Sequence, residues 1–127
     1  MTGLITVIFG AGTDIIEIDR VEAASAAFCE KTFTPAERSY ISEKKAQSAA
    51  GLFAAKEAVA KSLGTGFRGF RPIDVEILPD RLGKPVVRLH NRAAEIAAEN
   101  SVTAIHVSVS HCETYAVAYA VAEAENK

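Results

Sequence analysis

The chain has 127 residues, 49% hydrophobic and 24% charged, which is typical of one globular domain with a single core spanning residues 1–127. The net charge of −2 counts against nucleic acid as the main partner, because nucleic-acid-binding proteins present strongly basic surfaces. The apolar run over residues 4–9 is too short to span a membrane and has no basic leader, so we expect a cytoplasmic protein without a membrane partner. Cys29 and Cys112 form neither a metal-type pair nor a disulfide framework.

Strand-like and helix-like segments are grouped along the chain and do not alternate strictly, which predicts an α+β fold with an antiparallel sheet and packed helices. Thr34, Pro35 and Glu37 have the pattern of a capping box that starts a helix. Residues 80–84 predict a hairpin loop. The predicted strands are residues 5–18, 75–78, 86–89, 105–110 and 115–121; the predicted helices are residues 19–29 capped by Asp19, one from residue 35, 46–63 ended by Gly64, and 91–100 capped by Asn91.

Asp14 is a lone carboxylate in an otherwise apolar strand. On strand alternation it shares a face with Gly10 and Gly12, and we interpret these small residues as room for a ligand beside the backbone. A buried carboxylate must be paired, hydrated or bound to metal. The alternative, a solvated aspartate at a strand end, stays open from the sequence alone.

The predicted helix over residues 46–63 places Phe53, Glu57 and Lys61 four residues apart on one face. A carboxylate and an ammonium one turn apart suit a site for a metal and a diphosphate. The alternative is a surface ion pair, worth about 0.3–0.5 kcal/mol. The neighbouring face carries Leu52, Lys56, Val59 and Leu63.

The strand over residues 105–110 alternates between apolar and polar side chains. Its polar side could bind phosphate or simply face water, and a lone histidine at its end is more often structural than functional. Val107 and Val109 are expected on one side, and His106, Ser108 and Ser110 on the other, with His111 at the turn.

The order and spacing of these motifs strongly resemble the holo-acyl-carrier-protein synthase family, the small phosphopantetheinyl transferases. The resemblance extends from about residue 8 to residue 121. It rests on Gly12-x-Asp14 with Arg20, Phe53-x-x-Lys56-Glu57-x-x-x-Lys61, and Ser108-x-Ser110-His111, supported by the segments at residues 33–38, 64–67 and 83–85.

The resemblance implies a single-domain 4'-phosphopantetheinyl transferase fold, a homotrimer with shared active sites, and transfer of 4'-phosphopantetheine from coenzyme A to a serine of an acyl carrier protein. Asp14 and Glu57 would bind Mg²⁺ and form the catalytic set with Lys61, which contacts the diphosphate. Arg20 would dock the carrier protein. The implied coenzyme A-binding residues are Lys61; Gly83, Lys84 and Pro85 beside the adenine; Ser108 and His111 at the phosphates; and Lys44 and Lys45 near the 3'-phosphate.

The sequence departs from the family at Leu52, where relatives often carry a basic residue, and by about six additional residues at its start. Two other functions stay open: a metal-dependent hydrolase of nucleotide diphosphates, which needs the same acidic pair and lysine, and a binding module without activity. The base that accepts the serine proton could be Glu57 or a metal-bound water. For the three-fold axis of the trimer we expect an apolar face that includes Val107, Val109, Val117 and Val121.

Overall fold

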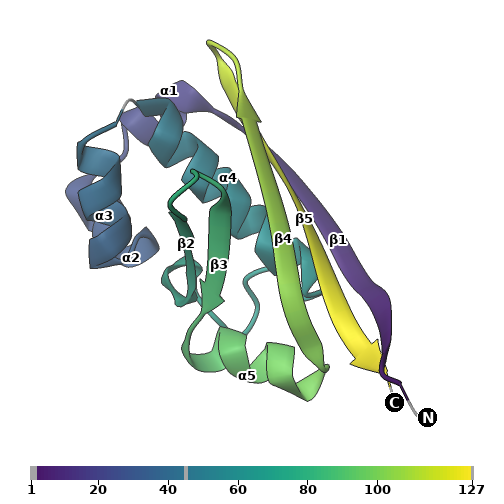
Figure 1. Cartoon of the computed structure of the whole chain (residues 1–127). Coiled ribbons are helices and arrows are strands. Elements are labelled where there is room, and N and C mark those ends of the chain that lie inside the picture. Colours follow the sequence, from purple (N-terminus) through teal and green to yellow (C-terminus); the bar gives the residue numbers. More distant parts are fainter. Residues whose placement is uncertain (1–2, 45, 127) are drawn as a thin grey trace.

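The computed structural model describes residues 3–44 and 46–126 and has an α+β architecture, as predicted. An antiparallel sheet in the order β1-β5-β4 and the β2–β3 hairpin lie on two sides of helix α4 (Figure 1). No described helix is both long and apolar enough to cross a membrane. The strands are β1 (Ile5–Glu17), β2 (Val75–Pro79), β3 (Pro85–Leu89), β4 (Val102–His111) and β5 (Tyr115–Asn126); the helices are α1 (Ile18–Glu22), α2 (Ala26–Thr32), α3 (Pro35–Ser42), α4 (Ala46–Ser62) and α5 (Asn91–Glu99), with a 3₁₀ turn, η1, at Pro72–Asp74.

Two predicted helix starts are wrong in detail. The helix expected over residues 19–29 is divided into α1 and α2, because Ser25 turns the chain and accepts a hydrogen bond from the amide of Phe28. Asp19 therefore lies inside the first turn of α1 instead of capping it. Asn91 is the first residue of α5 and not its cap, and its side chain donates to Asp74 instead.

The capping box at the start of α3 is confirmed, and it has a second use. Glu37 accepts from the amide of Thr34 and is itself fully buried, where it forms an ion pair of 2.7 Å with Lys56 of α4. Burial lowers the pKa of the Lys56 ammonium, and the charge of Glu37 opposes that shift. The sequence placed Lys56 on an apolar face but did not predict its partner.

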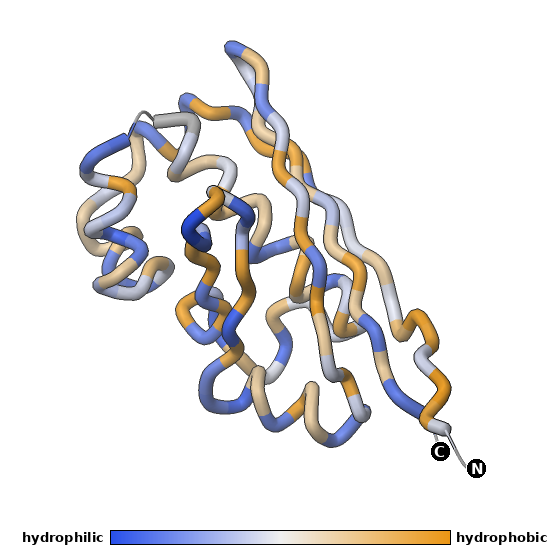
Figure 2. The backbone as a smooth tube through the Cα atoms, viewed as in Figure 1, coloured by the Kyte–Doolittle hydropathy of each residue, from blue (hydrophilic) through white to orange (hydrophobic). Residues whose placement is uncertain are grey.

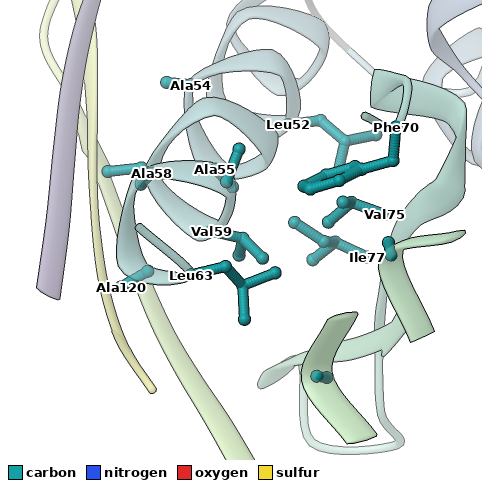
Figure 3. Close-up of a cluster of buried hydrophobic side chains, with 14 of the residues drawn as sticks. Leu52, Ala54, Ala55, Ala58, Val59, Leu63, Phe70, Val75, Ile77 and Ala120 are labelled. Carbon is teal, nitrogen blue, oxygen red and sulfur yellow. The ribbon is translucent and has the colours of Figure 1, made fainter. Parts of the chain in front are cut away.

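The core lies on both sides of α4. Towards the sheet, α4 presents alanines such as Ala54 and Ala58, and β5 buries every second residue, all of them alanine, from Ala116 to Ala124. On the other side, Leu52 and Val59 of α4, with Leu63 directly after the helix, are close to Phe70, Val75 and Ile77 (Figure 3). Figure 2 shows hydrophobic residues alternating with hydrophilic ones along the strands. The small alanine side chains bring the sheet close to the helix.

Close approach also explains the two glycines of β1. A Cβ on Gly10 would lie 2.2 Å from the carbonyl oxygen of Ser62, and one on Gly12 would lie 2.1 Å from that of Ala58. The expectation that these glycines leave room for a ligand is therefore wrong, because the backbone of α4 fills that space. Their function is to let α4 pack directly against the edge strand.

The four valines expected on one face lie on two. Val107 and Val109 pair with buried alanines of β5 and so face α4, whereas Val117 and Val121 point to the opposite side of the sheet. That opposite side, which we call the outer sheet face, carries Ile15, Tyr115, Val117 and Tyr119, exposed by 64%, 45%, 37% and 52%.

Gly12→Ala should destabilise the protein by about 1–3 kcal/mol, because the new methyl group would overlap backbone atoms that cannot move independently. Gly51→Ala in α4 is the control, since its methyl group would meet only the Val109 side chain, at 2.9 Å, and alanine favours a helix. Urea unfolding measures both. A Gly12→Ala protein as stable as the parent would contradict the close packing of β1 on α4.

Candidate functional site

The acidic residues predicted from the sequence meet on one flank of α4. Asp14 pairs with buried Ala118 across the sheet and so faces the helix, where Glu57 is partly buried. The Nζ of Lys61 donates to Asp14 Oδ1 at 3.2 Å and to the carbonyl of Thr13 at 2.9 Å. Asp14 is thus not isolated, although its side chain is 19% exposed, and the ion pair of Lys61 is made with Asp14 across two elements and not with Glu57 along the helix.

The electrostatics of this flank fit a bound cation. Burial raises the pKa of Glu57, the charge of Asp14 raises it further, and Lys61 partly offsets the shift. The two carboxylates therefore repel each other, and Lys61, half exposed, compensates only in part. A divalent cation between them would remove this repulsion.

Asp14 and Glu57 are a pair and not a complete metal cage. Within residues 3–44 and 46–126 no group of three or more His, Cys, Asp or Glu side chains is arranged to hold a metal. Mg²⁺ commonly binds through one or two carboxylates together with water and substrate phosphates. The donor set fits such a cation, provided that the substrate supplies the remaining oxygens.

A pocket of about 580 Å³ lies on the other flank of α4, between β4, α3 and the β2–β3 hairpin. It brings together five predicted coenzyme A-binding residues from two distant parts of the chain. His111, expected at the turn, is the last residue of β4, and its pairing with buried Ala116 places it on the pocket side. The five residues are Gly83, Lys84, Pro85, Ser108 and His111. Ser108 pairs with Tyr119 of the outer sheet face, so its side chain, unlike that of His111, points away from α4.

The loop at one rim of this pocket has a defined conformation. The predicted hairpin loop is confirmed: Asp80 accepts from the amides of Leu82 and Lys84, and Gly83 has φ +88°, which favours glycine. The amide groups of Asp80 and Gly83 also donate within the loop. The loop can therefore present Lys84 at the pocket without first becoming ordered.

Several pocket residues were not predicted as binding residues, among them Leu52 and Tyr40. Leu52, where the sequence departs from the family, is buried and forms part of the wall, and Tyr40 of α3 adds an aromatic ring. Lys44 lies over that ring, 5.5 Å from its centre, so this predicted phosphate contact is near the pocket. Lys45 lies outside the described residues. The only signal for Tyr40 in the sequence is an aromatic residue in the helix predicted from residue 35.

The predicted residues thus form two separate groups in one chain. Residues 55 and 57 are about 200° apart around a helix, so the pocket residue Ala55 and the acidic Glu57 point to opposite flanks. None of Asp14, Glu57 and Lys61 lines the pocket. Arg20 is exposed on α1, which follows the strand of Asp14, and it does not line the pocket.

Comparison with known proteins identifies the family of this chain. The family model of the 4'-phosphopantetheinyl transferase superfamily matches residues 10–120. The chain belongs to this superfamily. A holo-[acyl-carrier-protein] synthase of Clostridium beijerinckii is 48% identical to this protein over an alignment that covers 92% of this chain and 98% of the relative.

Solved structures of the superfamily have the same fold. The acyl carrier protein synthase of Plasmodium yoelii, with ADP bound, has a TM-score of 0.87 at 32% identity and covers 96% of this chain and 99% of that one. The holo-[acyl-carrier-protein] synthase of Bacillus anthracis, in complex with coenzyme A (3',5'-ADP), has a TM-score of 0.78 at 33% identity and covers 96% and 99%. The family indicated by the sequence motifs is confirmed.

Glu57→Gln should leave the fold at least as stable as the parent at pH 7 without metal. A carboxyl with a raised pKa in the folded state favours folding below its ordinary pKa and loses that contribution as the pH rises through the raised pKa. The stability advantage of the Glu57→Gln variant over the parent should therefore shrink as the pH falls through this range. Magnesium should then raise the melting temperature of the parent more than that of the variant.

Thermal unfolding with and without Mg²⁺, from pH 4 to pH 8, measures both effects. Glu30→Gln on exposed α2 makes the same chemical change away from Asp14 and serves as the control. A Glu57→Gln protein that melts well below the parent at pH 7 in the absence of metal would contradict the repulsion between the two carboxylates.

Proposed function

We propose that this protein transfers 4'-phosphopantetheine from coenzyme A to a serine of an apo acyl carrier protein and releases adenosine 3',5'-bisphosphate, in a magnesium-dependent reaction. The observation that carries the proposal is the pocket formed by the Gly83–Pro85 loop and the end of β4 together with the acidic pair on the opposite flank. The holo-[acyl-carrier-protein] synthase activity predicted from the motifs is confirmed by relatives 46–49% identical over most of the chain.

The pocket is suited to the nucleotide half of coenzyme A. Its walls combine apolar Leu52, Ile77 and Pro85, which can pack against adenine, with polar groups at the rim. Lys84, His111 and the nearby Lys44 can face phosphate oxygens there. The synthase of B. anthracis, whose structure holds coenzyme A (3',5'-ADP), has the same fold, which supports this assignment.

The reaction breaks one phosphorus–oxygen bond and forms another. The serine hydroxyl oxygen attacks the phosphorus that carries the pantetheine arm, the hydroxyl proton passes to a base, for which Glu57 is a candidate in this chain, the bond to the bridging oxygen breaks, and adenosine 3',5'-bisphosphate leaves with the electron pair. Asp14 and Glu57 would hold the metal, which supplies positive charge for the diphosphate. Lys61 can donate to the same diphosphate, because its ammonium is exposed on one side while Asp14 and the carbonyl of Thr13 orient it.

One subunit alone does not bring the two groups together. Asp14, Glu57 and Lys61 lie on one flank of α4 and the pocket on the other, so a complete site requires the acidic flank of one copy and the pocket of another. The outer sheet face gives the copies a surface for association, because Ile15, Val117 and Tyr119 leave large apolar areas exposed on a sheet that no described helix covers. Cyclic association of three copies would form three equal sites.

The carrier protein needs a separate docking surface. Arg20 is exposed on α1, directly after the strand that carries Asp14. Because this protein has a net charge of −2, attraction of an acidic carrier must come from a local basic surface and not from the whole molecule. Arg20 is our candidate for that surface.

Mass spectrometry of an apo acyl carrier protein tests the proposed reaction. Incubation with the protein, coenzyme A and Mg²⁺ should add one phosphopantetheine to the carrier, and adenosine 3',5'-bisphosphate should appear only when the carrier is present. The Glu57→Gln variant should lose most of this activity, because a hard cation favours a charged carboxylate. Release of nucleotide without carrier would instead identify a diphosphate hydrolase, and no turnover in either arm would refute both.

Mixed oligomers test the shared site. An Asp14→Ala protein and a His111→Ala protein should each be inactive, but activity should return after subunit exchange, because some interfaces then combine an intact acidic flank with an intact pocket. Mixing Asp14→Ala with Glu57→Gln is the matched control and should restore nothing, since both changes damage the acidic flank. Background activity in the first mixture, with exchange demonstrated by native mass spectrometry, would place both residues in the site of one subunit.

A further inference from the structure

The one fully buried ion pair among the described residues has no part in the chemistry above. Lys56 and Glu37 are 0% exposed and 2.7 Å apart. The Lys56 Nζ also donates to the carbonyl of Pro72 at 3.0 Å and to that of Val75. All three donors of the ammonium are thus used.

The carboxylate is equally occupied. Glu37 Oε1 accepts from the amide of Thr34 at 2.9 Å as well as from Lys56, and Oε2 accepts from the amide of Ile77 at 2.8 Å. Every bond of the pair is therefore directed at a backbone group or at the opposite charge. Such a network is directional in a way that apolar packing is not.

The elements joined by the pair are the elements that form the pocket. Lys56 lies on α4 and Glu37 on α3, and their backbone partners lie at the N-cap of α3, in η1 and in β2. Each of these helices and β2 also contributes residues to the pocket wall. The wall residues are Tyr40 of α3, Leu52 and Ala55 of α4, and Ile77, Leu78 and Pro79 of β2.

Stability alone gives a weak reason for such a pair. Removing two charges from water is costly, and apolar residues of similar size often stabilise a core as well or better. What the pair adds is a fixed spacing, because β2 cannot move away from α4 without leaving a buried charge or a backbone amide unpaired.

We propose that Lys56 and Glu37 are positioning residues that hold the β2–β3 wall against α4 and α3 at the spacing that admits the nucleotide half of coenzyme A. The inference rests on the proposed function, because the pocket is taken as the nucleotide site. Neither side chain lines the pocket, so both act through β2. The Gly83–Pro85 loop at the end of the β2–β3 hairpin is positioned by the same contacts.

The double variant Glu37→Gln/Lys56→Met tests the proposal, because it removes both charges together. The dissociation constant for adenosine 3',5'-bisphosphate should rise about tenfold or more, with a similar rise in the KM for coenzyme A and little change in kcat, since a misplaced wall weakens binding without touching the reacting groups. The binding of Mg²⁺, on the other flank of α4, should stay unchanged. Titration calorimetry well below the melting temperature provides both affinities.

Ile96→Ala is the matched control. Ile96 is buried in the same core but on α5, away from the pocket, so its loss lowers stability without moving the β2 wall. If the double variant does not fold, Glu37→Asp replaces it, because the carboxylate then falls short of either Lys56 or the amide of Ile77, and the dissociation constant should again rise.

Nucleotide affinity that equals that of the parent in a folded double or Glu37→Asp variant would overturn the proposal. So would an equal loss of affinity in Ile96→Ala. Failure of the proposed function has a different signature: the parent protein would not modify the carrier or would not bind adenosine 3',5'-bisphosphate at all.

Discussion

The distance between helix α4 and strand β1 is the constraint on which the site depends. Because Gly10 and Gly12 lack side chains, the helix backbone lies where a Cβ would otherwise be, and the alanines of β5 continue this close packing across the sheet. A larger residue at Gly12 would lift α4 from the edge strand. Asp14, two residues later on the same face, is brought beside Glu57 and Lys61 by this same packing.

Close packing on one flank has a consequence on the other. A helix pressed against β1 and β5 leaves space between its far side, β4 and the β2–β3 hairpin, and that space is the pocket. The helix therefore separates the carboxylates from the pocket within one chain. If the proposed function holds, a fold of this size has little room for coenzyme A inside a single copy, and association of copies would join the two halves.

Local features of the fold were predictable from the sequence, and long-range pairings were not. The capping box at Thr34, the hairpin loop at Asp80–Lys84 and the long helix α4 depend on neighbouring residues, so their signals are contained in short segments. The division of residues 19–29 into two helices depends on one serine cap that competes with continued helix, a small difference in free energy. Strand alternation assigned the faces of β4 correctly. It could not show that Val107 and Val109 would share a side of the sheet with the alanines of β5 and not with its valines.

The site shows the same division. The ordered motifs indicated Asp14, Glu57, Lys61 and the pocket residues, but the sequence suggested a wrong reason for the glycines and did not predict that Lys61 pairs with Asp14. Both have one cause: the contact between β1 and α4 joins residues almost fifty positions apart, and composition carries no information about that distance. Motif order predicted the residues, while the geometry between them required the structure.

Lys56 and Glu57 illustrate how one helix meets two opposed demands. Neighbours in an α-helix point about 100° apart, so consecutive charged residues can face different environments. Glu57 is partly exposed beside Asp14, where its charge remains available to a ligand, whereas Lys56 is turned into the core and needs Glu37 and two backbone carbonyls to be tolerated there. An apolar residue at position 56 would pack at lower electrostatic cost, but it would not tie α4 to α3 and β2 by directed bonds. The rotation of α4 that buries Lys56 is the same rotation that presents Glu57 to Asp14, so the buried pair and the acidic flank constrain the helix in one orientation.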